Sequence, residues 1–253
     1  MQNVNHGIYK QIMIKRLVLF FISFFDGIHQ KKIFNFLKKK GLKSFEIMLD
    51  VGAHRGETID IFLKNFKINK LISFEPSPLN FSVLKKKEIY YKNKFKNTNI
   101  ILENVALGNE NTKKQINHFK ESSSTSIKEI NTSANYYKKK IKILNLSEKD
   151  KLINSFEVTV LKSGEYLRDK NINKVNFLKI DTEGYEFEVL QGLGNEISKV
   201  ETIMFEHHYD NMIQKNYTYG DIFNLLKKNN FKMVYKAKMP FRRTFEYIFF
   251  NND

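Results

Sequence analysis

Acidic residues follow three short apolar segments of the sequence. If these segments are parallel strands, the acidic residues stand where such sheets bind their ligands. Asp50 lies at the end of the first segment, and Glu75 directly follows the second. Asp181 and Glu183 follow the third. Because the carboxyl ends of parallel strands meet at one edge of a sheet, we expect these carboxylates to lie together. There they could accept hydrogen bonds, carry a proton, or hold a divalent cation.

The turn after the first segment reads DVGAHRGE and combines glycines with acidic residues. A dinucleotide-binding turn would read G-x-G-x-x-G and direct a helix N-terminus at a pyrophosphate. Here only Gly52 and Gly56 are present, and Asp50 and Glu57 would repel a pyrophosphate. A cationic ligand without phosphate fits better, and S-adenosylmethionine has a sulfonium, an amino group and a ribose. Glu75, about twenty residues further on, could accept from both ribose hydroxyls, although NAD also carries a ribose.

The second acidic motif, DTEG, stands between an apolar strand and an apolar helix. Asp181 and Glu183 could act as a base and its orienting partner, whereas the structural alternative is a helix cap and a lysine-paired Glu. His207 and His208 end the next strand, and a histidine there could remove a hydroxyl proton. We expect His207→Ala to spare cofactor binding and lower turnover, and Asp50→Ala to abolish binding. No third ligand is suitably spaced, so no metal site is predicted.

Strand and helix patterns alternate along most of the chain. They predict a doubly wound, mostly parallel sheet with right-handed crossovers. The region 108–156 is polar and less regular, which suggests a hairpin or an inserted element facing the substrate. The predicted strands are 45–51, 71–74, 99–102 with a continuation at 105–107, 175–180, 202–205, 232–236 and 245–249, and the predicted helices are 57–66, 79–87, 187–193 and 219–229.

The composition narrows the possible functions. The chain has 253 residues, enough for one domain with a large core, and no cysteine. Disulfides, thiolate metal sites and the thiolate route to pyrimidine methylation are therefore excluded. The net charge of +16 favours polyanions, although the lysines are spread along the chain as on solvated faces. Amino-group methylation of bases usually relies on an Asn/Asp-Pro-Pro-aromatic loop, but the only prolines are Pro76, Pro78 and Pro240.

The first 45 residues differ from the rest. Leu17–Phe25 is an apolar stretch of about nine residues, too short to span a bilayer. Lys15 and Arg16 precede it as in a signal peptide, but no cleavage site follows. A helix packed on the domain and an interfacial membrane attachment both remain open. We predict an N-terminal helical extension over 1–45, a catalytic domain over 46–253, and a cytoplasmic location with membrane association left open.

Four segments together resemble the FkbM family of S-adenosylmethionine-dependent methyltransferases: IMLDVGAHRGE, LISFEPSP, ILENVALGN and FLKIDTEGYEFEVLQG. The resemblance spans roughly residues 46–250. It implies an α/β, Rossmann-like class I methyltransferase fold, with a seven-stranded sheet, an antiparallel last strand and helices on both faces. It also implies methyl transfer to a hydroxyl of a glycan or other natural product.

The resemblance implies cofactor positions for Asp50, Gly52, Gly56 and Glu75, a place near the adenine for Val105 and Ala106, and the acidic loop of the family pattern for Asp181 and Glu183. The full set of predicted residues combines these with the residues argued above and their neighbours. The predicted cofactor-binding residues are Asp50, Gly52, Ala53, Gly56, Glu57, Thr58, Glu75, Pro76, Val105 and Ala106, and the predicted catalytic residues are Asp181, Glu183 and His207. The expected partners are S-adenosylmethionine and a small-molecule or glycan acceptor. Two alternatives stay open, an RNA ribose-directed methyltransferase and a catalytically silent binding protein. Nucleic acid is disfavoured as a partner, and the acceptor and the oligomeric state are not predicted.

Overall fold

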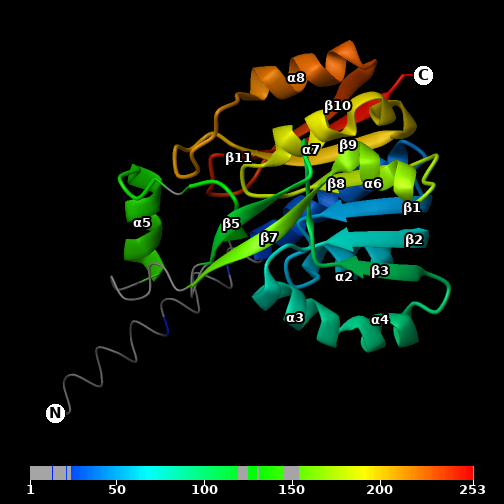
Figure 1. Ribbon diagram of the computed structural model, residues 1–253, viewed down its shortest axis with the longest axis horizontal. Coiled ribbons are helices and arrows are strands. Elements are labelled where there is room, and N and C mark those ends of the chain that lie inside the picture. Colours follow the sequence, from blue (N-terminus) through cyan, green and yellow to red (C-terminus); the bar gives the residue numbers. More distant parts are fainter. Residues whose placement is uncertain are drawn as a thin grey trace.

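The protein is built around a seven-stranded sheet (Figure 1). The computed structural model describes Met13, Phe21 and residues 24–118, 125–129, 131–144 and 154–252. β11 runs antiparallel to both of its neighbours, β9 and β10, and the other described strand pairs of this sheet are parallel, so the predicted mostly parallel sheet with an antiparallel last strand is confirmed. The strand order is β3 (Asn99–Glu103), β2 (Lys67–Phe74), β1 (Ser44–Val51), β8 (Phe177–Ile180), β9 (Thr202–His208), β11 (Thr244–Asn251) and β10 (Phe231–Lys238).

Helices cover both faces of this sheet, as predicted. Alternate residues of β1 point to opposite faces, so Leu49 packs into one apolar cluster and Met48 into the other. The Leu49 cluster includes residues of α6 (Ser163–Asp169), α7 (Glu186–Leu193) and α8 (Tyr219–Lys228). The Met48 cluster includes residues of the helical segment 24–39, α2 (Glu57–Asn65), α3 (Pro78–Lys86) and α4 (Glu88–Lys94).

A second, four-stranded sheet interrupts the alternation of strands and helices along the chain. Its strand order is β4 (Ala106–Gly108), β7 (Asn154–Lys162), β5 (Thr112–His118) and β6 (Thr125–Ser126), and α5 (Asn135–Leu144) also lies in this region. The prediction that 105–107 continues the third strand is wrong. Asn104 turns the chain by donating to the carbonyls of Glu75 and Pro76, at 2.8 and 3.2 Å, and Ala106 then pairs with Val160 instead.

This second sheet projects from the edge at which β1 and β2 end (Figure 1). Ser126 in β6 donates to the carbonyl of Glu183 at 2.7 Å. The amide of Asn131 donates to the carbonyl of Met212 at 2.8 Å. The inserted region therefore lies against the loops that follow β8 and β9.

The helical segment 24–39 packs on the sheet through Ile33 and Leu37, both fully buried. His29 Nε2 lies 2.5 Å from the carboxylate of Glu246, and both side chains are buried. The predicted N-terminal helix is thus confirmed for these residues, while the domain boundary at residue 45 stays a prediction. Most of Leu17–Phe25 lies outside the described residues. No helix in the described ranges is long and apolar enough to cross a membrane.

Candidate active site

The turn after β1 passes so close to the loop after β8 that a side chain would not fit. Gly52 has φ +92°, and a Cβ there would lie 1.9 Å from the carbonyl oxygen of Asp181. The amides of Gly52 and Ala53 donate to the carbonyl of Phe74, at 3.0 and 2.9 Å. Asp181 in turn donates its amide to the carbonyl of Val51 at 2.9 Å. The predicted glycine turn therefore holds the ends of β1, β2 and β8 together.

Gly52→Ala is expected to cost more stability than a matched glycine replacement. Gly41 has a similar φ of +88°, but a Cβ at that position would meet nothing within 4 Å, so Gly41→Ala tests the backbone strain alone. We expect that strain to cost about 1–2 kcal/mol, and the clash at Gly52 to add about 2 kcal/mol. Urea unfolding of both variants measures the difference. Equal losses would show that the contact with Asp181 does not constrain the turn.

The first of the predicted acidic residues, Asp50, is a buried carboxylate. It is fully buried at the end of β1, and among the described residues neither of its oxygens has a hydrogen-bond partner. Burial raises the pKa of Asp50 to about 6, although the nearby charge of Lys179 and the hydroxyl of Ser73, opposite Asp50 on β2, oppose this shift. Such orphaned acceptors at a sheet edge are typical of a site that a ligand completes.

Lys179 is the buried cation that this cluster of carboxylates surrounds. It lies opposite Asp50 in the pairing of β1 with β8, and its Nζ is 3.1 Å from Asp181 Oδ2. Burial alone would lower the pKa of Lys179, but the charges of Asp181, Asp50 and Glu206 outweigh it and raise this pKa. Burial, with the charge of Asp181, also raises the pKa of Glu206 well above its ordinary value. One protonated lysine thus faces three carboxyl groups.

Glu75 joins the loops after β1 and β2. Its carboxylate accepts from the amide of His54 at 2.7 Å and from the amide of Ser77 at 2.9 Å. Burial raises the pKa of Glu75 to about 7, although these two hydrogen bonds oppose the shift. Pro76 is half-buried beside it, and Val105 and Ala106 follow the Asn104 turn that binds the same loop.

The first turn of α2 carries two further predicted residues. The exposed Glu57 accepts from His54 Nδ1 at 3.2 Å and from the amide of Arg55 at 3.1 Å. Partial burial alone would raise the pKa of Glu57, but these hydrogen bonds outweigh that effect and lower the pKa to about 2. Thr58 is half-buried in the same turn. Gly56 precedes the helix with φ +88°, where a Cβ would lie 2.4 Å from the hydroxyl of Tyr91.

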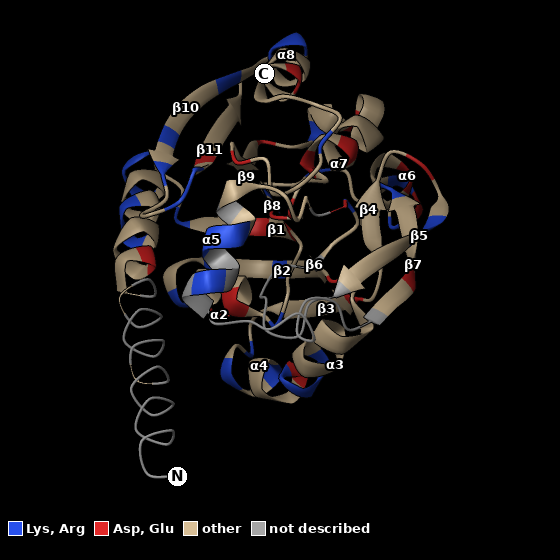
Figure 2. Ribbon diagram, turned by 90° about the vertical axis from the view of Figure 1, so that its left-hand side faces the viewer, with Lys and Arg blue, Asp and Glu red and all other residues tan. Residues whose placement is uncertain are grey.

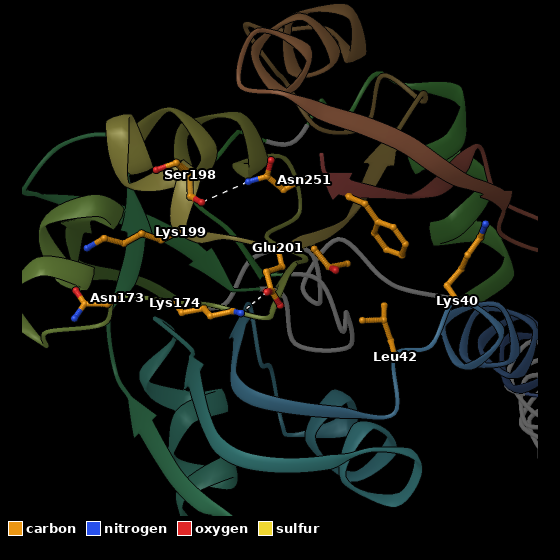
Figure 3. Close-up of a pocket in the computed structure, with 10 residues that line it drawn as sticks. Lys40, Leu42, Asn173, Lys174, Ser198, Lys199, Glu201 and Asn251 are labelled. Atoms are coloured by element: carbon orange, nitrogen blue, oxygen red, sulfur yellow. Dashed lines mark hydrogen bonds and ion pairs between the residues drawn. The ribbon is translucent and has the colours of Figure 1, made fainter. Parts of the chain in front are cut away.

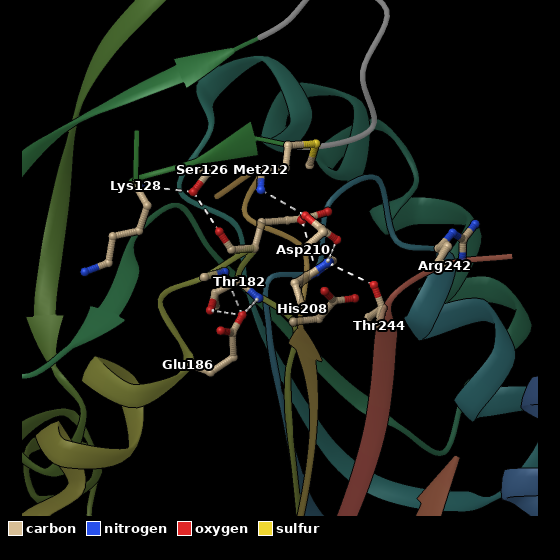
Figure 4. Close-up of polar contacts among 12 residues, drawn as sticks. Ser126, Lys128, Thr182, Glu186, His208, Asp210, Met212, Arg242 and Thr244 are labelled. Atoms are coloured by element: carbon tan, nitrogen blue, oxygen red, sulfur yellow. Dashed lines mark hydrogen bonds and ion pairs between the residues drawn. The ribbon is translucent and has the colours of Figure 1, made fainter. Parts of the chain in front are cut away.

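The acidic loop after β8 is held by a buried glutamate that sequence reasoning missed. Glu186 accepts from the amide of Thr182 at 3.2 Å, from its hydroxyl at 3.0 Å, and from the amide of Gly184 at 2.9 Å (Figure 4). Its other oxygen accepts from the hydroxyl of Tyr217. Glu183 has φ +52° inside this clamp, a conformation that non-glycine residues rarely adopt. The clamp therefore fixes the direction of Glu183.

His208, rather than His207, lies beside the acidic loop. His208 Nε2 is 3.3 Å from Glu183 Oε2, and Nδ1 shares a 3.0 Å hydrogen bond with the hydroxyl of Thr244 (Figure 4). Asp210 Oδ2 is 3.9 Å from the same Nδ1. Neither His208 Nε2 nor Glu183 Oε2 makes a hydrogen bond within the described part of the chain.

His207 points to the other face of the sheet, because successive side chains of β9 alternate. It is buried among the rings of Tyr209, Tyr217 and Tyr219, with ring centroids 4.8 to 6.0 Å apart. Burial, with the charge of Lys215, lowers the pKa of His207 to about 3. The structure thus brings Glu183 and His208 together, and it separates both from His207.

The family model of the methyltransferase FkbM domain matches residues 50–233, which include both glycine turn and acidic loop. The chain belongs to this family. A search of curated proteins found no match.

The FkbM domain also has similar solved structures. Methyltransferase FkbM from Methylobacillus flagellatus KT has a TM-score of 0.53 and 17% identity, covering 82% of this chain and 44% of that chain. TrmK from M. capricolum, solved with S-adenosyl-homocysteine, has a TM-score of 0.46 and 11% identity, and the match covers 83% of this chain and 63% of that chain. Magnesium protoporphyrin IX methyltransferase from Synechocystis PCC 6803 has a TM-score of 0.49 and 7% identity, covering 88% and 77%. The first similarity is one of fold alone. This chain spans less than half of that first structure and under two thirds of TrmK.

A surface hollow of this protein lies at the opposite end of the sheet. Its lining includes Leu42, which precedes β1, Ser198 and Lys199, which precede β9, and Asn251 at the end of β11 (Figure 3). Asn251 donates there to the carbonyl of Ser198 at 3.4 Å. Because Asp50 and Glu75 lie at the other strand ends, this hollow is separate from the acidic cluster. In the described ranges no group of three or more His, Asp or Glu side chains has metal-binding geometry.

Proposed function

We propose that this FkbM domain is an O-methyltransferase that transfers the methyl group of S-adenosylmethionine to a hydroxyl of a glycan or other natural product. S-adenosylmethionine is the cofactor, as expected for this family. The observation that carries the proposal is the buried Asp50, whose oxygens have no hydrogen-bond partner in the described residues, beside the side-chain-free turn at Gly52. A chain with a net charge of +16 has nevertheless gathered carboxylates at this edge.

The residues present fit the cofactor. Asp50 offers two acceptors for a cationic group, and Gly52 lets the turn after β1 pack directly against the backbone of Asp181. Glu75, at the end of β2, is the acceptor we assign to the ribose hydroxyls. Ala53, Gly56, Glu57, Thr58, Pro76, Val105 and Ala106 stay predicted cofactor-binding residues.

The bound cofactor supplies an electrophilic methyl group on a sulfonium. The protein's part is to align the acceptor hydroxyl and to take its proton, because in-line transfer depends mainly on alignment. We assign the proton to His208 Nε2, which has no hydrogen bond in the described residues. A tautomer with the proton on Nδ1, donating to Thr244 Oγ1, leaves Nε2 free to accept. Glu183 then stabilises the resulting imidazolium, and Asp181 stays a candidate base.

The acceptor is assigned to the side of the inserted region. Ser126 binds the backbone of Glu183, and the amide of Gln214 donates to the carbonyl of Glu129 at 2.9 Å. These contacts put the insertion beside the proposed base. Lysine and arginine residues occur on several elements, including α4, α5, α8 and β10, rather than on the insertion alone (Figure 2). This spread gives no support to a nucleic-acid acceptor, and we retain a cytoplasmic location as part of the proposal.

Titration calorimetry of the purified protein with S-adenosylhomocysteine tests the cofactor, and NAD serves as the parallel control. We expect micromolar binding of the former and no binding of NAD, since the acidic turn disfavours a pyrophosphate. Radiolabelled methyl transfer to a panel of glycans then tests the acceptor class. If well-folded protein did not bind S-adenosylhomocysteine, the proposal would be overturned. Methyl transfer to RNA and to none of the glycans would show that the acceptor is RNA.

A further inference from the structure

Large apolar side chains form an exposed stripe on the N-terminal helix. Phe21, Phe24, Phe25 and Ile28 stand at helical spacing and are 49%, 55%, 36% and 40% exposed. The opposite side of the same helix carries Ile33 and the other side chains that pack on the sheet. The exposed stripe is thus distinct from the face that stabilises the fold.

A second part of the chain extends this stripe. Phe241, in the turn between β10 and β11, is 74% exposed, and its ring lies 5.2 Å from that of Phe25. Two hydrogen bonds from the guanidinium of Arg242 to the carboxylate of Asp26, at 3.1 and 2.8 Å, hold the turn to the helix. We call Phe21, Phe24, Phe25, Ile28 and Phe241 the aromatic patch.

Basic residues border the aromatic patch. Lys31 and Lys32 are exposed on the helix, and Lys238 and Arg243 are exposed beside the turn. Residues 232–243 contain no acidic residue, and the only acidic residue between 21 and 40 is Asp26, which pairs with Arg242. An apolar centre with a positive border matches the headgroup layer of an anionic bilayer.

The aromatic patch lies at the same sheet edge as the proposed active site. The turn that carries Phe241 leads into β11, whose first residue, Thr244, pairs with His208 at the end of β9. Tyr209, the next residue, donates its amide to the carbonyl of Arg243 at 2.7 Å. A surface that bound the patch would therefore face the edge where the proposed base lies.

We propose that the aromatic patch docks this protein on the surface of an anionic lipid bilayer. A second copy of the chain is disfavoured, because two positive borders on proteins of net charge +16 would repel each other. A consequence, which rests on the proposed function, is that the methyl acceptor is the headgroup or glycan of a lipid-anchored molecule. Docking itself requires no cofactor or acceptor.

Co-sedimentation of the full chain with lipid vesicles tests the docking. We expect binding to phosphatidylglycerol–phosphatidylcholine vesicles, weakening at high salt, and at least about tenfold weaker binding to pure phosphatidylcholine. The double variant Phe24→Ser/Phe241→Ser is expected to partition at least about tenfold less. The matched control is Ile89→Ser, which removes a 73% exposed side chain from α4 and should leave binding unchanged.

The alternatives give different outcomes. Equal binding of the double variant and the parent protein would overturn the proposal. So would a dimer in light scattering that the double variant abolishes, because the patch would then bind a second copy. Far-UV circular dichroism of every variant confirms folding, and S-adenosylhomocysteine binding separates the two proposals. A protein that binds vesicles but not S-adenosylhomocysteine would contradict the function and leave the docking intact.

Discussion

Asp50→Asn is expected to weaken S-adenosylhomocysteine binding by about 10- to 100-fold, because a hydrogen bond to a buried charged acceptor contributes about 1.5–3 kcal/mol. Asn has nearly the same shape, so the turn at Gly52 should keep its geometry. The variant loses the negative charge that faces Lys179 and any cationic group of the cofactor. Calorimetry measures the affinity. Asp169→Asn, on the exposed end of α6, is the control and should bind like the parent protein.

The same carboxylates predict how affinity depends on pH. Burial raises the pKa of Asp50 to about 6 and that of Glu75 to about 7, so both are partly protonated in the free protein below neutrality. Their ionised forms accept hydrogen bonds, so affinity should rise from pH 5 to pH 8 and binding should release protons. Calorimetry in buffers of different ionisation enthalpy measures that release. Affinity independent of pH would contradict this account of both residues.

The free energy of unfolding of the free protein should fall as the pH rises, whereas the affinity for S-adenosylhomocysteine should increase. In the unfolded chain these two carboxyl groups have ordinary pKa values of 3.8 and 4.5. Between those values and 6 to 7 the folded state holds more protons than the unfolded state, so the free energy of unfolding falls as the pH rises. Each group contributes about 3 kcal/mol to this loss. Saturating S-adenosylhomocysteine should offset it.

The seven-stranded sheet could be predicted because its strands are short apolar runs closed by acidic or turn residues. The second sheet lacks that signal. Its strand β5 reads TKKQINH, which is largely polar, and its stability comes from pairing with β7 rather than from burial on both faces. Helix α4, reading EIYYKNK, buries only Tyr91 and therefore shows no apolar periodicity in the sequence.

The acidic residues of the site could be predicted from their positions after strands, but their partners could not. Lys179 stands in the apolar strand FLKI, and that anomaly was the available signal for a buried charge. Its role depends on Asp50 and Glu206, which reach it from neighbouring strands. Glu186 forms its clamp only because Glu183 and Gly184 take positive φ values, which the sequence does not encode as a pattern.

The choice between the two histidines shows a further limit. The alternation of side chains along β9 predicts that His207 and His208 point to opposite faces of the sheet. Because helices cover both faces, the apolar pattern does not reveal which of the two histidines contacts the acidic loop. That distinction depends on Glu183, whose position beside His208 follows from the clamp by Glu186.

His208→Ala is expected to lower kcat by about 1000-fold, within the usual contribution of a general base, and to leave S-adenosylhomocysteine affinity unchanged. The reason is its position: a proton on Nδ1 donated to Thr244 leaves Nε2 to accept the hydroxyl proton, and Glu183, 3.3 Å from Nε2, stabilises the imidazolium that forms. Thr244→Val should lower kcat by about tenfold, because the imidazole keeps its place but loses the bond that selects its tautomer. Single-turnover methyl transfer, with the affinity measured separately, gives both values.

His207→Phe is the matched comparison, because it keeps an aromatic side chain among Tyr209, Tyr217 and Tyr219. A histidine whose pKa burial lowers to about 3 is a weak base at neutral pH, so we expect His207→Phe to retain most of the parent kcat. Added imidazole should restore activity to His208→Ala, since the proton acceptor is what that variant lacks. If His207→Phe lost turnover while His208→Ala kept it, the base would be His207. The acceptor would then have to enter from the face of the sheet on which Tyr209, Tyr217 and Tyr219 surround His207.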